Sequence, residues 1–425
     1  MVQLVSQISL AQSPRDMLTA ISEHYWPLRP SDYMISMSTR DLAEGWYRVT
    51  RQVDIAAIQS GKISLDQADP WGDKGELPVV SGGILGEFIR QKRPLIASDL
   101  NVRGDPILGD SIAHLGSVMV LPLYHEGQPV YWNLAFRTGP RDYTDEQLEQ
   151  SLLVANLTGG TNTRLTLMEE VRTLNLALRH EFEEIARIQR SLLPPVLPDI
   201  AGIEIATSYL TSEQAGGDYY DFFKFADDYR GAFIADVSGH GAAAATVMAM
   251  LHGILHAYKG PGGDPAAVLR YANEQLMGAA LSGTFVTAFL AVYHPQEVSR
   301  GRTKLSFARA GHNPPLLKSG RDGTVSALAQ DGALPLGIND PYEIQSAAVV
   351  MYPMDTLLLY TDGITEAMSP DGEMFGPERL TETLSRSAGE PASLIKGIQA
   401  GIEHHSQGRT RKDDQTMVAV RYSGA

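Results

Sequence analysis

Acidic side chains stand at the ends of several apolar runs in the second half of this chain. Asp218 opens the run DYYDFF, and the run IAD ends at Asp236. Asp362 ends LLLYTD, and Asp413 and Asp414 directly precede QTMVAVRY. Carboxylates gathered at strand ends repel one another and raise each other's pKa, and a hard divalent cation removes that cost. The pattern predicts a metal site, although each Asp-Gly pair taken alone is explained more simply as a turn.

A predicted β-hairpin brings two of these acids together. The sequence YYDFFKFADDYRGAFIADV is typical of a strand, a turn at Asp227–Arg230 and a second strand. Pairing across that turn places Asp218 opposite Asp236, within about two residues, and cross-strand neighbours lie about 5 Å apart. If the strand that ends at Asp362 and the last strand of the chain are antiparallel neighbours, Asp362 faces the two acids at 413 and 414.

The types of donor atom favour Mg²⁺ or Mn²⁺ as the cofactor. The chain has no cysteine, and we identify no histidine pair at the spacing of a zinc site. Oxygen ligands are those that hard cations prefer. The sequence therefore predicts Mn²⁺ or Mg²⁺ rather than zinc at these carboxylates.

Five segments that contain these acids occur in the order of a known family's motifs. They are AGGDYYDFF (215–223), ADVSGHG (235–241), FARAGHNPPLL (307–317), LLYTDGITEA (358–367) and DDQTMVAV (413–420). They resemble the motifs of bacterial SpoIIE-type phosphatases, which are PPM-family metal-dependent serine/threonine phosphatases, and the resemblance covers about 195–422. It implies a phosphatase domain over 196–425, with an α+β fold in which two antiparallel sheets pack face to face between helices.

The resemblance also implies a ligand set for two ions. Asp236 resembles the carboxylate that bridges both ions, and the Val237 carbonyl resembles the backbone ligand beside it. Two glycines that follow, Gly239 and Gly241, would let the backbone pass closely by the metals. The remaining ligands of the implied set are Asp218, Asp362, Asp413 and, as an alternative to Asp413, Asp414.

The implied reaction is hydrolysis of a phosphoserine or phosphothreonine, with Asp218 and Asp236 as catalytic residues. Two ions acidify a shared water, which attacks phosphorus in line without a phosphoenzyme. Wider-family members carry a histidine two residues after the bridging acid, where this chain has Ser238. We weigh His240 and His312 as acids for the leaving group, but a role in shaping their turns is the simpler explanation of both.

The substrate implied by the resemblance is a phosphorylated regulatory protein, such as an anti-sigma-factor antagonist. Two alternatives stay open at this point. One is a catalytically silent dimeric module that signals by binding, and the other is a two-metal phosphohydrolase that acts on a small molecule.

The segment 1–160 is expected to be a separate α/β domain. SVMVLPLYHEGQPVYWNLAFR (117–137) predicts two strands joined by a turn at Glu126-Gly127, and 143–157 predicts a helix capped by Thr144. With RPLIASDL (93–100), these elements resemble a GAF domain, which implies a sensor that binds a small-molecule signal. The tryptophans could line a pocket, but an aromatic core explains them more simply; they are Trp26, Trp46, Trp71 and Trp132.

The segment 161–195 has the pattern of a coiled coil. Apolar residues recur at alternating steps of four and three, and Glu181 is the single break in the register. We expect a linker helix that forms a homodimer, and the alternative is an amphipathic helix lying on its own domain. The seam residues are Leu167, Val171, Leu174, Leu178, Ile185, Ile188 and Leu192.

The composition limits the classes of partner that this protein is expected to bind. The net charge is −15, which argues against nucleic acid and against an anionic membrane surface, because both require clustered Lys and Arg. The chain opens without a visible signal peptide and lacks cysteine, so we expect a cytoplasmic protein.

Overall fold

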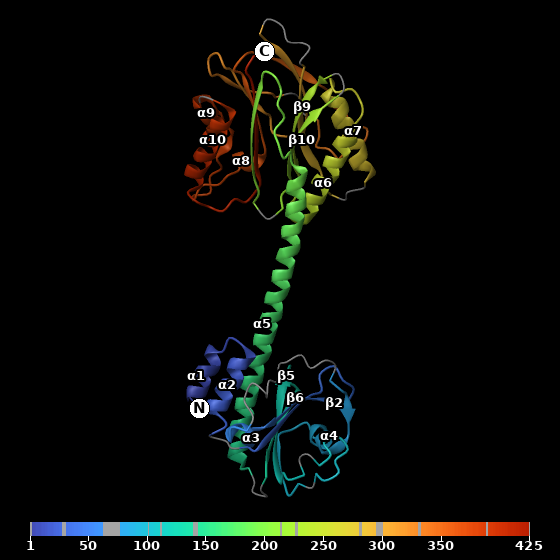
Figure 1. Ribbon diagram of the computed structural model, residues 1–425, viewed down its shortest axis with the longest axis vertical. Coiled ribbons are helices and arrows are strands. Elements are labelled where there is room, and N and C mark those ends of the chain that lie inside the picture. The colour runs from blue at the N-terminus through green and yellow to red at the C-terminus, as the bar shows by residue number, and fades with distance from the viewer. Residues whose placement is uncertain are drawn as a thin grey trace. The chain divides into compact units, whose positions relative to one another are not determined.

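The structure, a computed structural model, describes most of the chain in two compact units. These are Met1–Leu176 and Ala177–Ala425. The boundary falls inside α5 (Asp145–Leu192), one continuous helix of 48 residues (Figure 1). The helix predicted at 143–157 and the linker helix predicted at 161–195 are therefore one element. The residues described are 2–27, 31–62, 77–100, 102–110, 113–138, 143–212, 215–225, 228–279, 283–294, 301–329, 333–387 and 390–424.

The N-terminal unit is built on a six-stranded antiparallel sheet of order β3-β2-β1-β6-β5-β4. The predicted hairpin is β5 paired with β6, and its turn residues Glu126 and Gly127 both have positive φ, of 50° and 78°. That combination suits the twist of a two-residue hairpin loop. The elements are α1 (Val2–Leu10), α2 (Pro14–His24), β1 (Tyr33–Ser38), β2 (Trp46–Asp54), α3 (Ile55–Gln59), β3 (Val80–Ser81), α4 (Gly83–Arg90), β4 (Leu95–Ser98), β5 (Ser117–His125) and β6 (Gln128–Arg137).

The predicted N-cap of α5 is present. The Thr144 hydroxyl accepts a hydrogen bond from the Gln147 backbone N–H, and the Gln147 side chain accepts one from the Thr144 N–H. This reciprocal pair is a capping box, which satisfies two of the backbone donors that a helix start leaves without partners.

The tryptophans do not share one pocket. Trp132 is buried in the core of the sheet, whereas Trp46 is 44% exposed. Trp26 is buried and lines a cavity of about 630 Å³, which lies between the sheet, α2 and α5. Trp71 lies outside the described residues. The core role that we considered the simpler explanation therefore holds for Trp132 and for Trp26, which packs with Val53 and Ile55 as well as lining the cavity.

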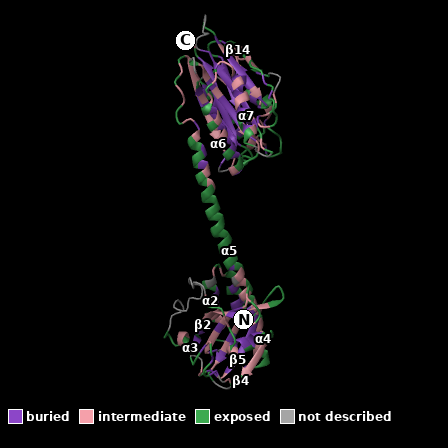
Figure 2. Cartoon of the chain, turned by 90° about the vertical axis from the view of Figure 1, so that its right-hand side faces the viewer, coloured by how far each residue is buried: buried purple, intermediate pink, exposed green. Residues whose placement is uncertain are grey.

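The C-terminal unit consists of two five-stranded antiparallel sheets packed face to face. Their orders are β14-β11-β10-β9-β8 and β13-β12-β15-β16-β7. Side chains from both sheets form one buried core, which includes Phe233 and Phe289 from the first sheet and Leu359 and Val418 from the second. Helices α6 and α7 cover the first sheet, and α9 and α10 cover the second (Figures 1 and 2). This confirms the predicted sandwich between helices.

The elements of this unit follow the predicted order, with one difference. The helical block predicted over 376–405 is two helices, and Pro391 begins the second because proline is favoured in the first turn of a helix. The elements are β7 (Ile203–Leu210), β8 (Asp218–Lys224), β9 (Arg230–Val237), α6 (Gly241–Ala257), α7 (Pro265–Gly278), β10 (Val286–Tyr293), β11 (Thr303–Ala310), β12 (Leu316–Lys318), β13 (Val325–Ala327), β14 (Ala347–Met351), β15 (Thr356–Tyr360), α8 (Asp362–Thr365), α9 (Gly376–Arg386), α10 (Pro391–Ser406) and β16 (Gln415–Tyr422).

Among the described residues, no helix combines the length and the apolar character that crossing a bilayer requires.

Candidate metal centre

The first pair of acids sits on the hairpin of β8 and β9. Asp218 is the direct cross-strand partner of Asp236, as the sequence predicted. β8 ends at Lys224 and β9 begins at Arg230. The start of the predicted turn, Asp227, lies outside the described residues. Both acids stand at the end of the first sheet from which α6 departs.

The second group of acids comes from the other sheet. β15 and β16 are antiparallel neighbours, and Asp362 begins the short helix α8 directly after β15. Carboxylate oxygens of Asp362, Glu366 and Asp413 lie within 4.8 Å of one another. The predicted meeting of Asp362 and Asp413 is therefore observed. Glu366 was missed, although its spacing of four residues from Asp362 places both on one side of a helical turn.

Asp218 links the two sheets. Its side chain is 1% exposed, and its Oδ2 accepts hydrogen bonds from the hydroxyls of Thr361, at 2.8 Å, and Thr416, at 2.5 Å. Thr361 directly follows β15 and Thr416 belongs to β16, so both come from the second sheet's side, and both are fully buried. Two donated hydrogen bonds fix the orientation of a carboxylate that burial alone would make costly.

Asp413 and Asp414 have different surroundings. Both oxygens of Asp414 accept hydrogen bonds from protein groups: Oδ1 from the Ser212 N–H at 2.8 Å and Oδ2 from the Gly217 N–H at 2.8 Å. Asp413 instead belongs to the group of clustered carboxylates, and its Oδ1 accepts a bond from the N–H of Asp414. Asp414 thus ties β16 to the loop before β8, while Asp413 faces the other acids.

The acids perturb one another's titration. Burial, then repulsion from Asp362 and Asp413, raises the pKa of Asp236 to about 8. Burial and the charge of Asp413 raise the pKa of Asp362 to about 6. Burial, then the charge of Asp236, raises the pKa of Asp218 well above its ordinary value. A divalent cation relieves this repulsion, and an all-oxygen donor set suits Mg²⁺ or Mn²⁺.

Glycines before β8 permit the close approach of these groups. A Cβ on Gly217 would lie 2.7 Å from the Val237 carbonyl oxygen and 3.3 Å from Asp236 Oδ1. These two predicted ligand atoms therefore border the same side of Gly217. For Gly239, no protein atom lies within 4 Å of an added Cβ, and its φ of +94° favours glycine in the turn after β9.

The histidines near the site have distinct roles. His240 is exposed at the N-cap of α6. Burial raises the pKa of Asp413, and His240 opposes that rise, which places this histidine near the acids. His312 is buried, with Nδ1 2.9 Å from the Thr287 hydroxyl, and burial lowers its pKa to about 4. Ser238 exchanges hydrogen bonds with the backbone of Phe285, so it fixes the turn after β9.

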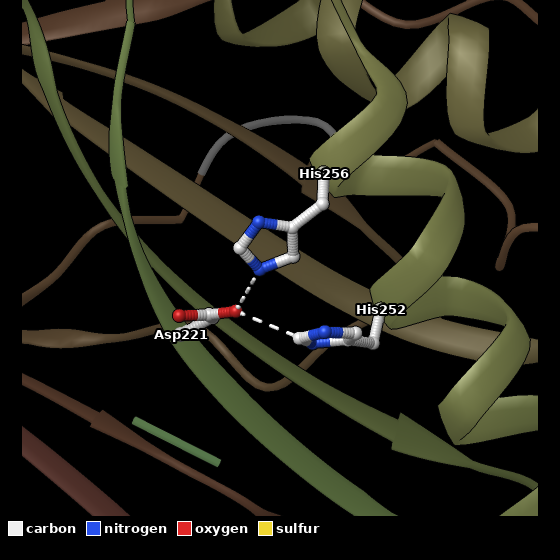
Figure 3. A group of neighbouring side chains, drawn as sticks. All are labelled: Asp221, His252 and His256. Carbon is white, nitrogen blue, oxygen red and sulfur yellow. Dashed lines mark hydrogen bonds and ion pairs between the residues drawn. The ribbon is translucent and has the colours of Figure 1, made fainter. Parts of the chain in front are cut away.

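One statement made from the sequence is wrong. His252 and His256 are four residues apart on α6 and do form a histidine pair at the spacing of a zinc site. They converge on Asp221 from β8 (Figure 3). This group is separate from the clustered carboxylates, because all three of its side chains lie between β8 and α6.

Comparison with known proteins identifies the C-terminal unit. Residues 226–423 match the family model described as Stage II sporulation protein E (SpoIIE). The match covers most of the segment whose motifs resemble those of SpoIIE-type phosphatases of the PPM family.

Two relatives are similar in sequence to about three fifths of the chain. Protein IcfG of Synechocystis sp. is 29% identical over 270 residues, which are 57% of this chain and 41% of IcfG. Phosphoserine phosphatase RsbU of Bacillus subtilis is 28% identical over 256 residues, which are 60% of this chain and 73% of RsbU. The chain thus spans about two fifths of IcfG and about three quarters of RsbU.

A solved structure supports the fold. The SiaA-PP2C domain of Pseudomonas aeruginosa superposes with a TM-score of 0.51 at 22% identity. The superposition covers 59% of this chain and 98% of that domain. At this identity, the likeness establishes the PP2C-type architecture of the sandwich.

Proposed function

We propose that the C-terminal unit is a metal-dependent protein phosphatase that hydrolyses phosphoserine or phosphothreonine on a regulatory protein, such as an anti-sigma-factor antagonist. The observation that carries the proposal is the convergence of acids from both sheets: Asp236, the cross-strand partner of Asp218, lies close enough to Asp362 and Asp413 to be repelled by their charges. Similarity to a phosphoserine phosphatase supports the substrate class. Two divalent ions, Mn²⁺ or Mg²⁺, would acidify water and neutralise the phosphoryl charge.

The surroundings of each acid suggest its role. We assign Asp236 as the bridging ligand, with the Val237 carbonyl beside it, because both oxygens border Gly217. Asp362 and Asp413 would complete the set. The hydrogen bonds that occupy both oxygens of Asp414 favour a positioning role for that residue, which leaves Asp413 as the ligand.

Asp218 and Glu366 complete the assignment. The two threonine hydroxyls fix the orientation of the Asp218 carboxylate, and Asp218 is the cross-strand partner of Asp236. Asp218 would orient water at the site as well as hold an ion. We add Glu366 to the ligand set, because its carboxylate lies within the same group as Asp362 and Asp413.

The proposed activity is tested by comparing substrates. Purified protein with Mn²⁺ should release phosphate from a phosphoserine or phosphothreonine peptide. It should do so much faster than from nucleotides or sugar phosphates. Equal or greater release from the small molecules would favour the alternative of a small-molecule phosphohydrolase. No release from any substrate, with intact fold, would favour a silent binding module.

We further propose that α5 regulates the metal centre. Near the end of α5, the Gln189 side chain is 3% exposed and forms hydrogen bonds with both backbone groups of Gly216. It accepts a hydrogen bond from the Gly216 N–H at 3.0 Å and donates one to the Gly216 carbonyl. Ala186 of α5 packs against Ala215 and against Ala245 of α6. A shift of α5 would therefore move the glycine loop, which is the segment with Gly216 and Gly217 that lies against the proposed metal ligands.

The N-terminal unit is proposed to be a GAF-like sensor that supplies the signal. Its support is the six-stranded sheet and the cavity of about 630 Å³, a size that suits a small molecule. The cavity combines apolar walls such as Met34 with polar groups such as Asn133 and Arg51. A signal bound there would act through α5 on the phosphatase.

We propose a homodimer formed through the middle of α5. The seam predicted from the heptads is largely exposed in the single chain: Leu174 is 62% exposed, Leu178 51% and Ile188 62%. A second copy of the helix would bury this stripe in the manner of a coiled coil.

A further inference from the structure

The two faces of β8 contact different elements, the second sheet on one side and α6 on the other. Because side chains alternate along a strand, Asp218 points to the second sheet, whereas Tyr219 and Asp221 point to α6. Asp221 is buried, and its Oδ1 accepts a hydrogen bond from the Phe222 N–H at 2.7 Å. Its Oδ2 faces α6 and is the acceptor around which the other groups gather.

Two histidines of α6 converge on that oxygen. His256 Nε2 lies 2.8 Å from Asp221 Oδ2, and His252 Nδ1 lies 3.6 Å from it (Figure 3). The centroids of the imidazole rings are 4.3 Å apart. The Tyr219 hydroxyl donates to the same carboxylate oxygen and lies 3.0 Å from His252 Nδ1. Four polar side chains therefore surround one small space between β8 and α6.

This arrangement exceeds what a structural hydrogen bond requires. One histidine suffices to satisfy a buried carboxylate, and His256 already does so. His252 Nδ1 is beyond hydrogen-bond distance of Oδ2 and is hydrogen-bonded instead to the Tyr219 hydroxyl, at 3.0 Å. It nevertheless lies within the 4.8 Å group of potential ligand atoms. A tetrahedral ion with bonds of about 2.0–2.1 Å spaces its ligands by about 3.3 Å. The two observed separations, 2.8 and 3.6 Å, lie on either side of that value.

We propose that Asp221, His252 and His256 form a second metal site, specific for Zn²⁺ or a similar borderline transition-metal ion. Two imidazole nitrogens and one carboxylate are a donor set that zinc prefers, whereas the clustered acids offer only oxygen. The side chains of His252 and His256 are 25% and 48% exposed, so an ion can enter from solvent and water can complete the coordination.

The site would fasten α6 to β8. α6 begins at Gly241, four residues after Val237 ends β9, and β8 begins at Asp218. An ion bound between them joins the helix to the strand that carries Asp218. The ligands act in the folded unit whether or not the acids hold ions, so the proposal does not depend on the proposed phosphatase activity.

Metal binding to the full chain tests the proposal. Zn²⁺ binding is measured by equilibrium dialysis in millimolar Mg²⁺, which competes for the oxygen-only cluster, and Co²⁺ is used as a spectroscopic probe of nitrogen ligation. We expect one tight Zn²⁺ per chain and visible Co²⁺ bands typical of a low-coordinate site. His252→Ala with His256→Ala should weaken Zn²⁺ binding about 100-fold and abolish the bands.

Controls separate this site from the acids and from misfolding. Asp236→Asn, which alters the carboxylate cluster, should leave the tight Zn²⁺ site unchanged, as should His404→Ala on the exposed part of α10. The single change His256→Gln affects a half-exposed side chain, so the fold is retained, and it should also weaken Zn²⁺ binding. The proposal is overturned if wild type binds no Zn²⁺ under these conditions, or if the His256→Gln chain binds it with wild-type affinity.

Discussion

Replacing Asp236 by asparagine should change how the metal-free protein responds to pH. The pKa of this carboxyl rises from an ordinary 3.8 to about 8 because of burial and the neighbouring acids. The folded state therefore holds the proton more tightly than the unfolded state, so the contribution of Asp236 to stability is most favourable below about pH 4 and is lost as the pH rises toward 8. Over that window one such group changes the free energy of unfolding by up to about 1.4 kcal/mol for each pH unit.

The effect is large enough to measure between pH 6 and pH 7.5. With EDTA present, ionisation of Asp236 alone should lower the free energy of unfolding of the wild type by about 2 kcal/mol between pH 6 and pH 7.5. The Asp236→Asn chain lacks that contribution and should lose clearly less stability, since an amide does not ionise. Mn²⁺ should restore stability to the wild type at pH 7.5, because bound ions replace the protons.

The assay can separate the two units within one chain. All four tryptophans lie between positions 26 and 132, so tryptophan fluorescence follows unfolding of the N-terminal unit and serves as an internal control. Tyrosine near-ultraviolet dichroism, in which the C-terminal unit is well represented, follows the unit that carries the acids. If wild type and Asp236→Asn show the same pH dependence in EDTA, the acids do not repel one another as described, and the electrostatic basis of the site is refuted.

Three further predictions concern assembly and control. Gln189→Ala removes both hydrogen bonds to the glycine loop and should raise the Mn²⁺ concentration needed for half-maximal activity several-fold, while Arg187→Ala on the exposed side of α5 should not; equal titration curves would exclude control through this contact. Leu174→Asp with Leu178→Asp should convert a dimer to monomers in light scattering, because unpaired charges in an apolar seam are costly, and a monomeric wild type at micromolar concentration would contradict the dimer. Gly217→Ala should abolish tight Mn²⁺ binding, since its Cβ would press on two ligand oxygens; unchanged Mn²⁺ affinity by calorimetry would mean that the loop can move aside.

The sequence predicted most of the sandwich and much of the site, for a physical reason. The apolar runs that end in acids fix strand ends, and hairpin pairing follows from a short turn, so the pairing of Asp218 with Asp236 could be deduced locally. The meeting of Asp362 with Asp413 needed only one assumption, that their strands are neighbours. These predictions depend on strand register, which side-chain alternation specifies strongly.

What the sequence could not supply were contacts between segments far apart in the chain. The threonine hydroxyls that hold Asp218 come from the opposite sheet, and nothing local marks them. The two hydrogen bonds between Gln189 and Gly216 likewise depend on where the end of α5 lies against the loop before β8. The histidine pair on α6 was visible in the sequence as a four-residue spacing, but its carboxylate partner on β8 became evident only once the helix was placed on the strand.

The most direct test of the central claim is metal-dependent hydrolysis by chains altered at the acids. Initial rates of phosphate release from a phosphoserine peptide are measured across a Mn²⁺ titration for wild type, Asp236→Asn and Asp362→Asn, with folding checked by circular dichroism. If acids from the two sheets jointly hold the catalytic ions, each single change should lower the rate more than about 100-fold at any Mn²⁺ concentration. The fold should remain intact. Rates within a few-fold of wild type for both folded variants would contradict the assignment of a two-metal phosphatase site to this cluster.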